Sequence, residues 1–78
     1  MIKVEFTIEP FVEGEPPARV TLAVAAIEAT GVVVEIGVFG SSFTATEEQI
    51  GPAVAALVQT AHANGATHVT ITTEQLDK

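Results

Sequence analysis

Apolar and polar residues alternate most regularly near the start of the chain. From Ile2 to Ile8 every second side chain is apolar, and the residues between are Lys, Glu or Thr. Successive side chains of a strand point to opposite faces, so this pattern predicts a strand with one buried and one solvated face. The alternation stops at Pro10, and residues 11–17 mix Gly and Pro as a loop does.

A second alternating region, residues 32–46, predicts a central hairpin of two short strands. Its apolar parity comprises Val32, Val34, Ile36, Val38, Phe43 and Ala45, and its polar parity comprises Glu35, Gly37, Ser42 and Thr44. Gly40 marks the bend, and Gly37 leaves space where a ligand or another backbone can approach. Two interpretations of these glycines remain open: they serve the geometry of the turn, or they take part in binding.

Two segments have the 3.6-residue spacing of amphipathic helices. In residues 18–30 the apolar face includes Val20, Ala23 and Ile27, and Gly31 follows as a C-terminal stop. The second segment begins at Thr46-Glu47-Glu48-Gln49, which has the form of a capping box, and continues to Asn64-Gly65. Pro52 lies deep in this helix, so either the helix kinks there or its regular part starts near Gly51.

A last strand is expected over residues 67–73, with Val69 and Ile71 on one face. The order strand, helix, strand, strand, helix, strand is typical of a single ferredoxin-like α+β domain spanning residues 1–78. In its usual arrangement, the sheet order is four, one, three, two, with both helices on one face. The polar parities then share the uncovered face, where Glu5, Thr7, Ser42 and Thr44 form a central patch flanked by Glu35 and the threonines of the last strand.

Charge and composition narrow the possible partners. Three basic against ten acidic side chains give a net charge of −7, which repels a phosphate backbone and argues against nucleic acid. The apolar runs are too short for a membrane span, and no signal peptide is evident, so a cytoplasmic location is expected. Because so small a domain without cysteine has few ways to gain stability, a homo-oligomer is expected.

Catalytic and metal-binding signatures are weak. The spacing of His62 and His68 fits no common metal site, and both are interpreted as surface residues. Ser41 and Ser42 have no base nearby in the sequence, and the glycines of the hairpin lack the following helix that a phosphate loop requires. The prediction is a protein that is not an enzyme and that needs no cofactor or metal.

Three segments together resemble the small thiamine/hydroxymethylpyrimidine-binding proteins. They are Val4-Glu5-Phe6-Thr7-Ile8-Glu9-Pro10-Phe11, Gly37-Val38-Phe39-Gly40-Ser41-Ser42 and Asn64-Gly65-Ala66-Thr67-His68-Val69. The resemblance implies a ferredoxin-like domain, dimers or tetramers, no catalysis, and a pocket for thiamine or its pyrimidine part. It carries Glu5, Thr7, Gly37, Ser41, Ser42 and Thr44 over as binding residues. The chain departs from the family at Thr44-Ala45, where a Glu-Gly pair is common.

The chemistry of such a ligand agrees with the polar face. Glu35 or Glu5 could stabilise a fixed positive thiazolium, and Phe39 or Phe11 offers a flat surface for a ring. Two alternatives remain beside binding. The polar face could be a subunit interface with no ligand, or the domain could be a small enzyme that works as a dimer through His62 or His68.

Overall fold

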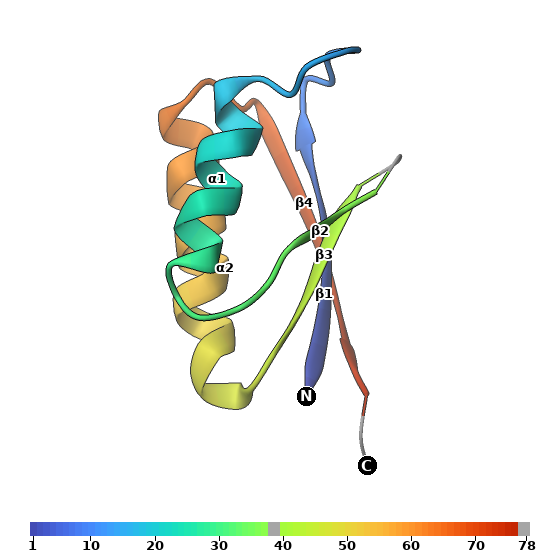
Figure 1. Cartoon of the computed structure of the whole chain (residues 1–78), viewed down its shortest axis with the longest axis vertical. Coiled ribbons are helices and arrows are strands. Elements are labelled where there is room, and N and C mark those ends of the chain that lie inside the picture. The colour runs from blue at the N-terminus through green and yellow to red at the C-terminus, as the bar shows by residue number, and fades with distance from the viewer. Residues whose placement is uncertain (38–39, 77–78) are drawn as a thin grey trace.

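The computed structural model describes residues 1–37 and 40–76. Their elements are β1 (Ile2–Glu9), α1 (Ala18–Glu28), β2 (Glu35–Ile36), β3 (Ser41–Ala45), α2 (Glu47–Ala63) and β4 (His68–Gln75). The strands form one antiparallel sheet in the order β2-β3-β1-β4, and α1 and α2 lie side by side over one of its faces (Figure 1). The predicted ferredoxin-like α+β fold is confirmed.

The core lies between the helices and the apolar parity of the central strands. Val4, Phe6 and Ile8 of β1 are buried, as are Phe43 and Ala45 of β3. The rings of Phe6 and Phe43 meet at a centroid distance of 6.1 Å and a tilt of 57°, a geometry that favours aromatic pairs. The alternation read from the sequence is confirmed on both strands, and it fixes which face remains for solvent.

The helices contribute small residues and a few large ones to the same core. Ala23 and Ile27 of α1 and Ala53, Leu57 and Ala61 of α2 are buried. Their spacing of four residues aligns them along one side of each helix. Alanine at three of the five positions lets the two helices approach each other closely over the sheet.

The ends of the helices differ in how they are held. At α2 the Thr46 hydroxyl accepts from the Gln49 N–H at 3.2 Å, and the Gln49 side chain accepts from the Thr46 N–H at 3.0 Å, which confirms the capping box. At α1 no side chain caps the start, and Pro17 occupies the N-cap. Gly31, with a φ of +103°, follows the end of α1 and confirms the predicted stop.

Pro52 lies inside α2, which runs from Glu47 to Ala63. Of the two alternatives for this helix, a regular part that starts near Gly51 is therefore wrong. Proline has no N–H to donate to the Glu48 carbonyl, and both residues are exposed. Water can reach that side of the helix and replace the missing partner, so the proline is tolerated there.

Strand β2 is shorter than its sequence pattern predicts, with two residues where the pattern covers 32–38. Val32 is buried and Val34 partly buried, but Ile36 is 62% exposed, so its predicted place in the core is wrong. The Val34 N–H donates to the Glu28 carboxylate of α1 at 3.1 Å, and the pairing with β3 begins only at Glu35. Val38 lies outside the described residues.

Strand β4 extends two residues beyond its predicted end and begins one residue later, at His68. Its register places Val69 opposite Ile8 and Ile71 opposite Phe6, on the helix side, as predicted. Within residues 1–37 and 40–76, neither helix is both long enough and apolar enough to cross a membrane.

Candidate functional site on the open sheet face

The face of the sheet opposite the helices carries a hollow with a volume of about 750 Å³. We call this the central hollow. It is lined by Glu5, Phe6, Thr7, Glu35, Ile36, Gly37, Gly40, Ser41, Ser42, Thr70 and Thr72. Its volume falls within the range of about 300–1,000 Å³ that small-molecule sites occupy. Every strand of the sheet contributes to it, so the fold itself brings its residues together.

One cross-strand row forms the floor of the central hollow. Glu35 is the register partner of Ser42, Ser42 of Glu5, and Glu5 of Thr72. Register partners point to the same face, and neighbouring strands lie about 4.8 Å apart. The two carboxylates therefore stand on either side of the Ser42 hydroxyl, with their Cα atoms about 10 Å apart.

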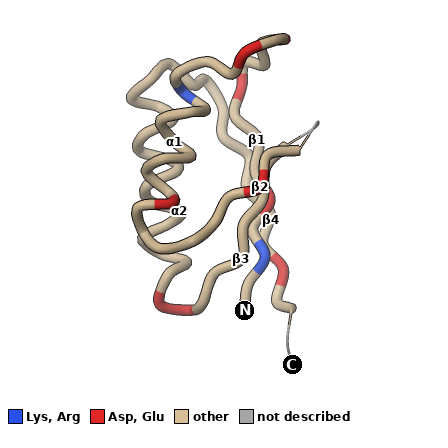
Figure 2. The backbone as a smooth tube through the Cα atoms, in the orientation of Figure 1, with Lys and Arg blue, Asp and Glu red and all other residues tan. Residues whose placement is uncertain are grey.

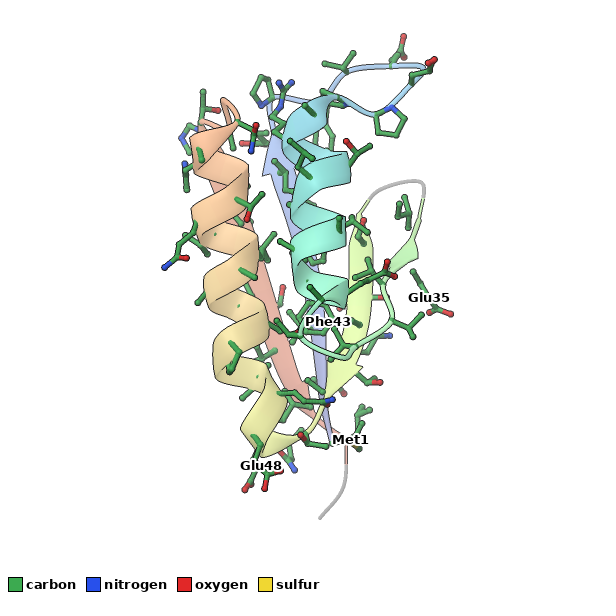
Figure 3. All side chains as sticks on the ribbon, turned by 60° about the vertical axis from the view of Figure 1, so that its left-hand side comes forward. Met1, Glu35, Phe43 and Glu48 are labelled. Carbon is green, nitrogen blue, oxygen red and sulfur yellow. The ribbon has the colours of Figure 1, made fainter. Side chains whose placement is uncertain are left out.

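This row carries the negative charges of Glu5 and Glu35 and contains no basic side chain. Glu5 and Glu35 are exposed, and Glu35 projects away from the helices (Figure 3). Lys3 shares the face, but its register partners are Thr44 and Glu74, one row away. Figure 2 shows acidic positions on the strands and few basic ones. Such a surface attracts a small cation or a donor-rich molecule.

Most of the predicted binding residues meet in the central hollow. Those that line it are Glu5, Thr7, Glu35, Gly37, Ser41 and Ser42. Thr44 lies instead in a neighbouring hollow with Lys3 and Val33. The prediction for Phe39 falls outside the described residues. Ser41 differs from its neighbour, because its register partners Phe6 and Ile36 place it on the helix side of the sheet.

Residues absent from the predicted binding set also line the central hollow. Thr70 and Thr72 were expected on the same face, and the pairing of Thr7 with Thr70 and Glu5 with Thr72 brings them to its wall. Phe6 and Ile36 reach it although both have the apolar parity. The alternation in β4 is the sequence signal for the threonines. Ile36 gives no such signal, because its exposure follows from the short β2.

A second, more apolar hollow of about 210 Å³ adjoins the first. We call this the apolar hollow. Its wall includes Phe11 and Val12 of the loop before α1, and it shares Ile36 and Ser41 with the central hollow. The loop is held in place because the Arg19 guanidinium donates two hydrogen bonds to the Pro10 carbonyl, at 3.1 and 2.6 Å. Phe11, which is 65% exposed, thus offers its ring here and away from the row of carboxylates.

The glycines of the hairpin are required by close backbone contacts. The Gly37 N–H donates to the Gly40 carbonyl at 2.7 Å, and a Cβ on Gly37 would lie 2.8 Å from that oxygen. A Cβ on Gly40 would lie 3.1 Å from the Phe6 carbonyl oxygen and 3.2 Å from the Thr7 methyl group. The structural interpretation of these glycines is therefore sufficient, and both glycines also line the two hollows.

The histidines contact local partners outside the central hollow. Nδ1 of His62 lies 3.0 Å from the Ala66 carbonyl oxygen, and Nδ1 of His68 lies 3.0 Å from the Thr67 hydroxyl and 3.8 Å from the Glu9 carboxylate. Both side chains are exposed. In the described part of the chain, no three His, Asp or Glu residues are grouped in a way that could hold a metal ion.

Comparisons with known proteins show that the fold of this chain is similar to that of solved structures. No family model and no curated protein matches the sequence. Among solved structures, a domain of unknown function, DUF77, from Bacillus cereus is 18% identical with a TM-score of 0.64, over 94% of this chain and 71% of the other. The hypothetical protein MJ1052 from Methanocaldococcus jannaschii is 19% identical with a TM-score of 0.62, over 99% of this chain and 82% of the other. At such identities the likeness supports the ferredoxin-like fold alone.

Proposed function

We propose that the protein binds thiamine or its hydroxymethylpyrimidine part in the central hollow, without catalysing a reaction. The observation that carries the proposal is the row of Glu35, Ser42 and Glu5, in which two carboxylates flank a hydroxyl on an uncovered sheet face. A fixed cation is attracted to two carboxylates, while an aminopyrimidine offers an amino donor and ring-nitrogen acceptors. These are the groups that carboxylates and hydroxyls bind.

The apolar hollow supports the same assignment. Thiamine joins a charged ring to a second, flat ring, and the two hollows join a carboxylate-lined floor to a surface that includes Phe11 and Ile36. In the proposed pose the thiazolium lies over Glu5 and Glu35. The pyrimidine then extends past Gly37 and Gly40, which line both hollows, toward Phe11, where aromatic surface contributes about 0.5–1.5 kcal/mol.

Isothermal titration calorimetry tests the assignment directly. Thiamine and hydroxymethylpyrimidine are titrated separately into the folded protein, with choline as a cation that lacks the rings. We expect saturable binding of thiamine and little heat with choline. No heat with either ring compound at millimolar concentration, with circular dichroism showing a folded sample, would contradict the proposal.

Matched variants identify the site. Glu5→Gln and Glu35→Gln each remove one charge and keep the shape of the side chain. A charge-assisted hydrogen bond contributes about 1.5–3 kcal/mol, so each variant is expected to weaken thiamine binding by at least about tenfold. Glu48→Gln removes the same charge from the exposed first turn of α2 and should leave the affinity unchanged. Equal losses in all three variants would indicate a general charge effect without a site.

A second candidate function is an assembly module whose sheet face is buried by another subunit. The observation that favours it is the hollow beside the central one, where Val33 is 74% exposed and Leu76 is 49% exposed near Thr44. If this function holds, Glu5→Ala or Thr44→Val changes the assembly state, measured by analytical ultracentrifugation, and thiamine produces no heat with any variant.

A further inference from the structure

Three hollows follow one another along the open face of the sheet. The apolar hollow and the central hollow share Gly37 and Gly40. The central hollow shares Glu35 and Ser42 with a third hollow of about 470 Å³, which we call the lysine hollow. The rest of its lining includes Lys3, Val33, Thr44 and Leu76. The three hollows therefore form one track, with the acidic row in the middle.

The strand register fixes how the lysine hollow lies relative to that row. Lys3 pairs with Thr44 of β3 and with Glu74 of β4, which gives a second cross-strand row. This second row lies two residues along the strands from the row of Ser42 and Glu5, a step of about 7 Å. A step of two residues restores the direction of the side chains, so both rows face away from the helices. Lys3 therefore stands beside the acidic row on the same surface.

The ammonium group of Lys3 has no partner in the described part of the chain. It forms no hydrogen bond and no ion pair there, although Glu74 is its register neighbour. The hydroxyl groups of Thr44 and Ser42 likewise have no hydrogen-bond partner among residues 1–37 and 40–76. Over the same residues, Lys3 is the one basic side chain that lines any of the three hollows. An ammonium beside two hydroxyl donors is a donor set suited to phosphate oxygens.

We infer that the lysine hollow binds the phosphate of a phosphate monoester, so that thiamine monophosphate binds more tightly than thiamine. The inference rests on the proposed function, because it extends the pose in which the thiazolium lies over Glu5 and Glu35. The pyrimidine and the two-carbon alcohol arm of thiamine leave the thiazolium ring from different atoms. When the pyrimidine extends toward Phe11, the arm can extend the other way, toward Lys3. The apolar, acidic and basic parts of the track then match the ring, the cation and the phosphate in order.

The nearby carboxylates limit the negative charge that the lysine hollow accepts. Glu35 lines it, and Glu74 is next to Lys3 in the row. Both carboxylates are exposed, so their repulsion acts through water and is screened over about 8 Å at physiological salt, whereas the phosphate contacts the ammonium directly. A diphosphate carries further charge, and no second basic side chain among the described lining residues receives it. The monoester is therefore the form that this subsite matches best.

Isothermal titration calorimetry with four ligands tests the inference. Thiamine, thiamine monophosphate, thiamine diphosphate and inorganic phosphate are titrated separately into the folded protein. We expect the monophosphate to bind about fivefold more tightly than thiamine, because a charge-assisted contact is gained against some repulsion. The diphosphate should bind more weakly than the monophosphate, and inorganic phosphate alone should give little heat. The preference should shrink at about 0.5 M salt, where an exposed charge pair is screened.

Matched variants assign the preference to one side chain. Lys3→Gln should abolish the preference for the monophosphate and leave the affinity for thiamine within about twofold, whereas Lys3→Arg keeps the charge and the preference. Gln59→Glu makes the same change in net charge on the exposed side of α2 and should leave the preference unchanged. Glu74→Gln removes a repelling charge and should tighten binding of the monophosphate about threefold. Circular dichroism checks the fold of each variant.

The results separate this inference from the proposed function. If thiamine binds and its monophosphate binds equally or more weakly, the phosphate subsite is wrong and the proposed function stands. A preference that survives in Lys3→Gln also overturns the inference, as does inorganic phosphate that binds as tightly as the ester. If neither thiamine nor its monophosphate binds, the function and the inference both fail. Should Lys3→Gln not fold, an unchanged affinity of Glu74→Gln for the monophosphate overturns the inference instead.

Discussion

The two faces of one sheet are built from alternate residues of the same strands, yet they differ in almost every physical respect. On the helix side, Val4, Phe6 and Phe43 are nearly inaccessible to water, and no polar side chain is buried among the described residues. On the other side, Glu5, Ser42 and Thr72 form an uncovered polar row. Stability therefore resides on one face, and the other is free to carry recognition.

The strongest test of this contrast is a pair of adjacent substitutions in β3. Phe43→Ala empties a buried aromatic position and should lower the free energy of unfolding by about 3–5 kcal/mol. Thr44→Ala, one residue further and on the open face, should cost less than about 1 kcal/mol. Urea denaturation followed by circular dichroism measures both.

Phe43→Ala can leave too little folded protein to measure, so Phe43→Leu serves as a milder variant, expected to cost about 1.5 kcal/mol or less. Equal costs at residues 43 and 44 would contradict the division of roles between the faces.

A substitution on the exposed side of α2 is expected to raise the free energy of unfolding, by less than Phe43→Ala lowers it. Pro52→Ala restores an N–H that can donate to the Glu48 carbonyl, and the change should raise the free energy of unfolding by about 1–3 kcal/mol. The gain is reduced because alanine gives the unfolded chain more freedom than proline. Thermal unfolding measures it, and Gly51→Ala, also exposed with open space around its missing Cβ, is the matched control with an expected gain of about 1 kcal/mol. A loss of stability on Pro52→Ala would show that the proline has a packing role.

A substitution at the junction between β3 and α2 is expected to have the next smaller effect on stability. Thr46→Ala removes the hydroxyl that accepts from the Gln49 N–H, and about 1 kcal/mol of stability should be lost with it. Thr46→Ser retains the hydroxyl and should behave as the wild type does. Urea denaturation of the three proteins side by side checks this, and an unchanged Thr46→Ala protein would mean that water replaces the cap without cost.

The smallest effect on stability is expected where the effect on binding is largest. Glu5→Gln changes an exposed residue, so the free energy of unfolding should stay within about 0.5 kcal/mol of the wild-type value. Chemical denaturation and thiamine titration on one preparation compare the two properties. A stability loss above about 1 kcal/mol would mean that Glu5 is a structural residue, in conflict with the contrast between the faces.

Period-two alternation was sufficient to predict β1, β3 and the covered face, because each apolar residue there lies beneath a helix. It was also sufficient for Thr70 and Thr72, whose place beside Glu5 follows from the register of β4 and β1. The capping box was read correctly at Thr46, since its chemistry is local and needs only four residues.

Sequence patterns are less informative where a residue's environment depends on residues that are distant in the sequence. Ile36 has the spacing of a core residue and pairs with Ser41, but its strand has only two residues and its side chain is 62% exposed. Ser41 lines the central hollow as expected, but only its pairing with Phe6 shows that it has the parity of the helix side. Thr44 shares the open face but lies one row from the carboxylates, a distance that alternation cannot report.

The Leu76 N–H donates to the Met1 carbonyl at 3.0 Å, next to the pairing of β4 with β1. This pairing affects the order in which the parts of the domain fold. Strands β4 and β1 are neighbours in the sheet but lie at opposite ends of the sequence, so their pairing closes the longest loop in the domain. A circular permutant that joins these ends through a short connector and opens the chain at Gly14 would turn this pairing into a local hairpin. Its lower contact order should make refolding faster than that of the parent, with the same final structure.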